Sequence, residues 1–150
     1  MSLRPAIVPA GINAELHAFG ERVTLHLTGE QTNGQLTTWT EITPPGGGPP
    51  PHYHLQEDEH FVVLEGTVSF FQNDTWREVG PGGAVFMPRK VIHAFKNVGT
   101  QPSRMLITTT PSGFETFFAH CADEFKQPGG PDMNRILQIG AEHGIHFVTQ

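Results

Sequence analysis

Short segments in which apolar and polar residues alternate dominate the first 110 positions of the chain. In "ERVTLHLTG" an apolar residue occupies every second position from Val23 to Leu27. This is the period of a β-strand, whose successive side chains point to opposite faces. Similar segments include "GQLTTWTEIT", "EHFVVLEGTVSFF", "TWREVG", "GGAVFMP", "VIHAFKNVG" and "SRMLITTTP". About seven or eight strands at this spacing predict a β-sandwich or a small closed barrel.

Glycine and proline separate these strands. The loop "PPGGGPPP" at 44–51 cannot form a helix or a central strand, because proline lacks the backbone donor and restricts the residue before it. Asn73 and Asp74 lie between two strand patterns and predict the turn of a hairpin.

The pattern changes to helical spacing after Pro111. "SGFETFFAHCADEF" places four phenylalanines and Cys121 on one helical face, and Ser112 with Glu115 predicts a capping box. A second helix is expected from a cap at Asp132 to Gly144, with its inward face formed by Met133, Ile136 and Leu137. We therefore expect a single domain over 1–150, with an irregular arm at about 1–19, a β-barrel at about 20–110 and two short C-terminal helices at about 112–144.

Composition narrows the classes of function. A chain of 150 residues suits one domain. A net charge of −6 without any Lys/Arg cluster larger than a pair argues against nucleic-acid binding. No apolar run has the length of a signal peptide or a membrane span, so we expect a soluble, cytoplasmic protein. Cys121 is the single cysteine, which excludes an intrachain disulfide and favours a buried structural thiol.

Three histidines and a glutamate form the candidate chemical centre. His52 and His54 are two positions apart, so both imidazoles point to the same face of a strand. Glu59 begins the inward set of the next strand, and His93 lies on a later one. Three imidazoles and a carboxylate suit a first-row divalent metal and leave coordination positions for a substrate or oxygen. An ion would also explain why so many ionisable groups lie beside a buried strand.

Other acids and histidines have weaker claims as ligands. A slipped strand register would exchange Asp58 for Glu59, whereas Glu57 is expected to be a turn acid. His60 points to the opposite face. The remaining histidines lack ligand spacing and are expected to be structural or exposed: His17, His26, His120, His143 and His146. Of these, His26 is a candidate for lining the cavity.

Two linked motifs resemble those of the cupin superfamily. The first is Gly46-x5-His52-x-His54-x4-Glu59-x6-Gly66. The second is Gly82-x5-Pro88-x-Lys90-x2-His93-x3-Asn97, which departs from the family pattern only where Lys90 replaces a glycine in a turn. The resemblance implies an all-β antiparallel jelly-roll barrel that holds one divalent transition metal (Fe, Ni, Mn, Cu, Co or Zn). It implies as ligands His52, His54, Glu59 and His93.

The chain is also similar to small single-domain cupins of the quercetin 2,3-dioxygenase-like type. That likeness implies a dioxygenase acting on a small aromatic or enol substrate, with Glu59 as the catalytic base. The candidate lining is apolar and consists of Trp39, Tyr53, Phe61, Phe70, Phe86, Phe95 and Met105, although such residues commonly form core. Arg89 and Lys90 lie at the expected mouth.

Two alternatives remain open. The first is a metal-dependent isomerase, epimerase or lyase, which would need further acid–base groups in the barrel, such as Glu41 or His26. The second is a non-catalytic module that binds a metal and a small molecule. Cupins of this size commonly form homodimers, which the resemblance suggests here.

Overall fold

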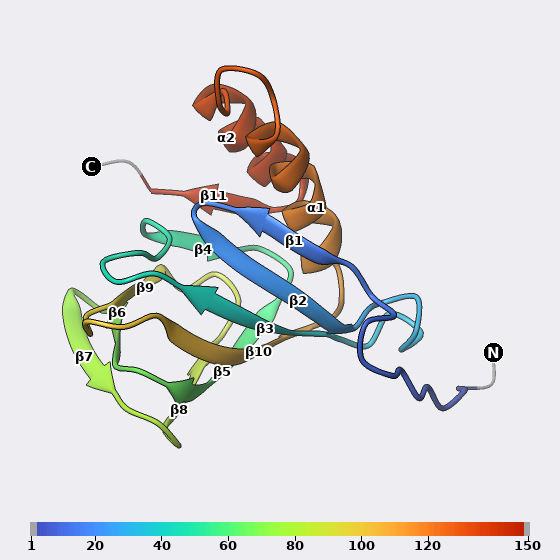
Figure 1. Ribbon diagram of the computed structural model, residues 1–150, viewed down its shortest axis with the longest axis horizontal. Helices are drawn as coiled ribbons and strands as arrows, with labels where there is room; N and C mark the ends of the chain where they lie inside the picture. The colour runs from blue at the N-terminus through green and yellow to red at the C-terminus, as the bar shows by residue number, and fades with distance from the viewer. Residues whose placement is uncertain (1–2, 149–150) are drawn as a thin grey trace.

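Two antiparallel β-sheets form most of the computed structural model, which describes residues 3–148 (Figure 1). The first sheet has six strands in the order β1 (Glu15–Ala18), β2 (Glu21–Leu27), β3 (Thr37–Thr43), β10 (Ser103–Thr110), β5 (Asp58–Glu65) and β8 (Ala84–Met87). The second has five in the order β11 (Ile145–Phe147), β4 (His52–His54), β9 (His93–Asn97), β6 (Val68–Gln72) and β7 (Thr75–Val79).

The prediction of an antiparallel, mainly β fold with two short helices is confirmed, but the closed barrel is not. Within residues 3–148 the strand ladders fall into two separate sheets, arranged like a sandwich. The edge strands end their own sheets instead of pairing across to the other one. The very short β4 joins β9 through a single register pair, His52 with His93, so this end of the second sheet is only loosely connected.

Strand β5 shows how the alternating pattern builds the core. Phe61 and Val63 are buried, whereas His60 and Leu64 on the other face are exposed. The same strand pairs with β10 on one side and β8 on the other, so it is an interior strand of the first sheet, next to the edge strand β8. The predicted orientation of Glu59 toward the interior follows from this register.

The expected irregular arm is partly wrong, and the expected hairpin is confirmed. Residues 15–18 form β1, which pairs with β2 through Leu16 and Val23; residues 1–2 lie outside the described part. The β6–β7 turn has positive φ angles of 57° at Asn73 and 60° at Asp74, as a type I′ turn requires.

Helix α1 (Phe114–Phe125) packs on its own chain, against β1 and α2. Its predicted apolar stripe is confirmed: Phe114, Phe117, Phe118 and Cys121 are buried. Burial also raises the pKa of the Cys121 thiol to about 12, in keeping with a structural role.

The predicted capping box of α1 is wrong. Gly113 is the N-cap, and no side chain caps the helix. Glu115 instead accepts hydrogen bonds from the amides of Gly113 and Gly29, at 3.0 and 2.7 Å, and from the hydroxyl of Thr37. The carboxylate thus ties the start of the helix to the β2–β3 loop and to β3.

Helix α2 (Met133–Glu142) begins as predicted, because the Asp132 carboxylate accepts a hydrogen bond from the Asn134 amide at 2.9 Å. Its predicted inward face is confirmed only at Ile136. Ile136 and Ile139 are buried, whereas Met133 and Leu137 are exposed, so the buried stripe lies further round the helix. Neither helix has the length and apolar character that a membrane span needs within the described chain.

Candidate metal centre and cavity

The four predicted ligands meet between the two sheets. His52 and His54 lie on β4, Glu59 on β5 and His93 at the start of β9, and all four are buried. One nitrogen or oxygen atom of each side chain lies within 4.8 Å of those of the others. Strand period places both β4 imidazoles on one face, and the pairing of His52 with His93 adds the third.

Each imidazole is oriented by a hydrogen bond at its Nδ1 atom. The acceptors are the Pro50 carbonyl for His52 at 2.9 Å, the Val91 carbonyl for His93 at 3.0 Å and the Glu57 carboxylate for His54 at 2.9 Å. An imidazole that donates from Nδ1 presents its lone pair at Nε2. These contacts favour the tautomer that a metal ligand needs.

The Nε2 atoms of His54 and His93 lie close to the Glu59 carboxylate. Its Oε1 lies 3.1 Å from Nε2 of His93 and 3.5 Å from Nε2 of His54. The Nε2 of His54 is buried without a hydrogen-bond partner. A buried atom of this kind is costly unless something binds it, and a divalent ion would do so. The donor set therefore fits a first-row transition metal.

The electrostatics of the centre support a neutral His52 beside the Glu59 carboxylate. Burial, together with the charges of the neighbouring histidines, lowers the pKa of His52 to about 3. Burial alone would raise the pKa of Glu59, but the hydrogen bond with His93 and the charges of the histidines outweigh it and lower the pKa. At neutral pH these two groups have the protonation states of metal ligands.

The acids next to Glu59 have different positions. Glu57, predicted as a turn acid, is buried and holds His54. Asp58 points away and pairs with Arg89, whose Nε lies 3.2 Å from its Oδ1. This hydrogen bonding lowers the pKa of Asp58 and, from the other side, raises that of Arg89. The register that would make Asp58 a ligand is therefore not adopted.

Lys90 has a positive φ angle at the position where the cupin motif has a glycine. Its φ is 71°, which side chains with a Cβ rarely adopt. The Lys90 amide donates to the carbonyl of His54 at 2.6 Å, and the Val91 amide donates to that of Pro88 at 3.4 Å. The turn before His93 is thus intact, at the cost of a strained lysine.

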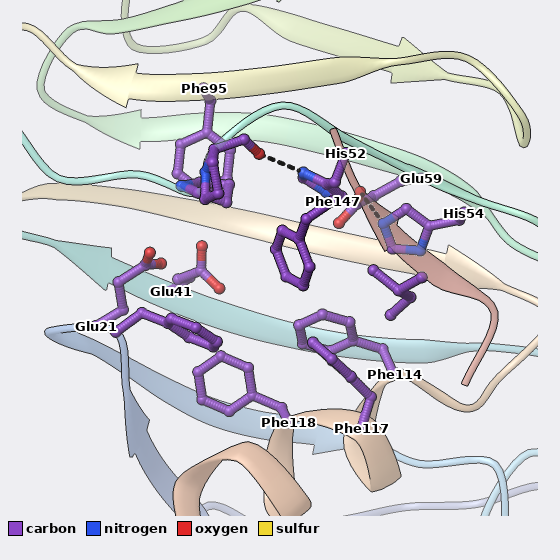
Figure 2. Close-up of a pocket in the computed structure, with 14 residues that line it drawn as sticks. Glu21, Glu41, His52, His54, Glu59, Phe95, Phe114, Phe117, Phe118 and Phe147 are labelled. Carbon is purple, nitrogen blue, oxygen red and sulfur yellow. Dashed lines mark hydrogen bonds and ion pairs between the residues drawn. The ribbon is translucent and has the colours of Figure 1, made fainter. Parts of the chain in front are cut away.

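A cavity of about 60 Å³ opens from this centre. That is several times the space that one water occupies, so it suits a ligand of few heavy atoms. Figure 2 shows the histidines and Glu59 at one end, Glu21 and Glu41 at the other and phenylalanine rings between them. The lining residues are Phe19, Glu21, Glu41, Pro49, Pro50, His52, His54, Glu59, Phe95, Phe114, Phe117, Phe118, Ile145 and Phe147.

Of the seven residues predicted to line the pocket, Phe95 does so. Four others are core: Trp39, Phe61, Phe70 and Met105. Tyr53 lies between the two β4 histidines and therefore points to the other face, where it stacks on His146. Phe86 is 56% exposed and packs edge-on against His60. The lining comes instead from α1 and β11, which are distant in sequence from the motif.

The remaining candidates lie outside the cavity. His26 is exposed, with its Nε2 atom 2.5 Å from the Thr40 hydroxyl, and it does not line the cavity. His120 and His143 lie at the surface of the helices, with ring nitrogens 3.1 Å apart. Arg89 and Lys90 are exposed and do not line the cavity.

Glu21 and Glu41 form a buried pair of acids. The sequence indicated Glu41 as a possible acid–base group but not its partner Glu21. They hydrogen-bond to each other, and desolvation raises the pKa of both, that of Glu41 strongly and with help from the charge of Glu21. Glu41 also accepts from the Trp39 indole at 3.3 Å, and Glu21 from the Thr43 hydroxyl at 3.4 Å. The available signal was an acid at an inward position of an alternating strand.

Comparisons with known proteins show what this site is similar to. Residues 39–109 match the Cupin domain family, a span that includes all four candidate ligands. An uncharacterized protein of Methanocaldococcus jannaschii, MJ1618, is 29% identical over 70 residues, which cover 47% of this chain and 56% of that protein. The chain thus matches little more than half the length of that relative.

Two solved structures share the fold. KdgF from Halomonas sp. aligns with a TM-score of 0.64 and 15% identity, over 74% of this chain and 99% of that one. A predicted oxalate decarboxylase from Thermotoga maritima aligns with a TM-score of 0.58 and 21% identity, over 61% and 80%. These likenesses show the fold, and the match of residues 39–109 to the Cupin domain family supports the resemblance that the motif residues carry.

Proposed function

We propose that the protein is a metal-dependent enzyme that binds one divalent transition metal at His52, His54, Glu59 and His93 and oxidises a small enol substrate with O2. The observation behind the metal is the convergence of four buried donor atoms, one of which, Nε2 of His54, lacks a partner. The choice of a small substrate is supported by the small cavity beside this centre, whose walls are largely phenylalanine side chains.

The side chains have distinct parts in this reaction. A bound ion would polarise the coordinating oxygen atoms of the substrate and lower the pKa of its enol hydroxyl. Glu59 accepts that proton, which its position beside the ligand nitrogens allows. Phe114, Phe117 and Phe147 surround the reacting carbons and exclude water, while oxygen supplies both atoms that enter the product.

Cavity size restricts the substrate. A cavity of about 60 Å³ is far too small for a three-ring flavonol, so the substrate that we propose is a compact enol or diketone. The proposal therefore keeps the dioxygenase chemistry of the resemblance but assigns it a smaller substrate.

A lyase or isomerase that uses no oxygen is the second candidate. Glu21 and Glu41 favour it, because they add acid–base groups at the end of the cavity opposite the metal centre. Such an enzyme would move a proton or break a carbon–carbon bond while the ion polarises a carbonyl.

Metal analysis followed by oxygen uptake tests the proposal. Near-stoichiometric transition metal in the purified protein should fall sharply in Glu59→Ala and stay unchanged in His60→Ala, a matched neighbour that points outward. Oxygen consumption with acetylacetone or catechol by the metal-loaded protein supports the dioxygenase. Turnover without oxygen selects the second candidate, and a metal-free protein that takes up no ion rejects both. Homodimer formation and a cytoplasmic location stay predictions from the sequence.

A further inference from the structure

The end of the cavity opposite the metal centre is unusual for an apolar pocket. Glu21 and Glu41 are 5% and 4% exposed, and neither makes an ion pair with a cationic side chain of the described chain. Burial of two carboxyl groups without a cation is costly. Structural needs do not explain this cost, since apart from each other the two carboxyl groups contact only the Thr43 hydroxyl and the Trp39 indole, at 3.4 and 3.3 Å.

Neighbouring residues show which way the pair is directed. Glu21 is the first residue of β2 and Glu41 lies on β3, and both side chains line the same cavity as His52, His54 and Glu59. In Figure 2 their carboxyl groups face the space enclosed by Phe118 and Phe95. The walls between the two polar ends are formed by phenylalanine, proline and isoleucine side chains.

We propose that Glu21 and Glu41 bind the end of the substrate distal to the metal, and that they select molecules with a hydrogen-bond donor there, either a hydroxyl or a protonated amine. The substrate class is then a short molecule with an oxygen-donor group at one end, an apolar middle and a donor group at the other end. This inference rests on the proposed metal site but not on which of the two reactions occurs.

The charges of the cavity agree with this assignment. Burial raises the pKa of both carboxyl groups, and two carboxyl groups in such close contact titrate as a pair. No lysine or arginine lines the cavity. An ionised carboxylate of the pair would bind a hydroxyl donor by a charge-assisted hydrogen bond, and an ammonium group would also compensate its negative charge.

Binding of three probes to the cobalt(II)-loaded protein tests the inference. The probes are 4-hydroxybutanoate, 4-aminobutanoate and pentanoate, which match in heavy-atom number and differ only in the distal group. Calorimetry gives affinities, and the visible spectrum of cobalt reports whether the carboxylate reaches the ion. At least one donor probe should bind about tenfold more tightly than pentanoate, as expected for a charge-assisted hydrogen bond. The tighter of the two identifies the donor.

Variants assign this preference to the pair. It should disappear in Glu21→Met/Glu41→Met, which keeps side-chain length without polar atoms, and shrink in Glu41→Gln, which retains a hydrogen-bonding amide. Glu15→Gln, on the exposed side of β1, should behave as wild type. Cobalt content is measured in every sample, so a damaged metal site is distinguished from a lost distal contact.

Two results would overturn the inference. One is equal affinity for all three probes, or a donor preference that survives in the folded, cobalt-loaded double variant; either leaves the proposed metal enzyme standing. The other is failure of every probe to bind the cobalt-loaded wild type. Wild-type protein that binds no cobalt would overturn the proposed function together with this inference.

Discussion

Glu57 hydrogen-bonds to His54 through the imidazole nitrogen that faces away from Glu59: Oε2 of Glu57 lies 2.9 Å from Nδ1 of His54, and both side chains are almost fully buried. The contact places a negative charge on the side of the ring opposite to the candidate metal position. Burial alone would lower the pKa of His54, but the hydrogen bond to Glu57 and the charges of Glu59 and Glu57 together raise it. Such an orienting carboxylate makes the imidazole a stronger ligand.

The first prediction follows from that contact. Glu57→Ala should weaken metal binding about 10- to 100-fold, the usual effect of removing a residue that orients a ligand. Competition with a chromophoric chelator measures the change. Glu65→Gln, an exposed acid at the other end of β5 that pairs with Arg104, is the control and should bind metal as wild type does. Unchanged affinity in Glu57→Ala would mean that His54 needs no orienting partner.

The second prediction concerns the pH dependence of stability. The pKa of Glu41 is raised by burial and by the charge of Glu21. Below pH 4.5, its ordinary pKa, the folded and unfolded states both hold the proton; as the pH rises above this value the unfolded chain ionises first, so the free energy of unfolding falls. Glu41→Gln does not titrate and should therefore become progressively more stable than wild type as the pH rises.

Urea unfolding of the metal-free protein between pH 4 and pH 8 measures this difference. Glu78→Gln, on exposed β7, should give a curve parallel to that of wild type. A constant offset between Glu41→Gln and wild type across the whole range would show that Glu41 ionises in the folded protein as it does in the unfolded one.

Three of the four candidate ligands could be predicted from strand period, whereas His93 lies far along the chain and was assigned with the second cupin motif. His52 and His54 share a face through strand period, and Glu59 is the first inward residue of a clearly alternating strand. Tyr53 could have been excluded from the pocket by the same rule. Sheet closure could not be predicted, since alternation specifies which face is buried and not whether the edge strands meet.

The cavity wall depended on long-range packing. Phe114 and Phe118 were correctly assigned to a buried helical stripe, but the stripe has no feature that says which surface it covers. The same is true of Phe147, which reaches the cavity because β11 pairs with β4 after some 90 intervening residues. Glu21 and Glu41 are far apart in sequence and meet only because β2 pairs with β3.

The third prediction tests how α1 is attached. Phe114 stacks on Trp39 with ring centroids 4.0 Å apart and planes 2° from parallel. Phe114→Ala should destabilise the protein by about 3–5 kcal/mol, because it leaves a cavity beneath the helix. Phe86→Ala removes the same side chain from an exposed position and should change stability by less than about 0.5 kcal/mol. Comparable losses in the two variants, measured by urea unfolding, would contradict the packing described for α1.

The fourth prediction concerns Lys90, whose φ of 71° places a side chain where the cupin motif has glycine. Lys90→Gly relieves a strain of about 1–2 kcal/mol but adds freedom to the unfolded chain, so we expect a net gain of up to about 1 kcal/mol. Because the backbone amide of residue 90 still donates its hydrogen bond to the His54 carbonyl, metal affinity should not change. Lys96→Gly, in the middle of β9, is the matched control and should destabilise. A loss of stability in Lys90→Gly would show that the lysine side chain stabilises the turn by more than its backbone strain costs.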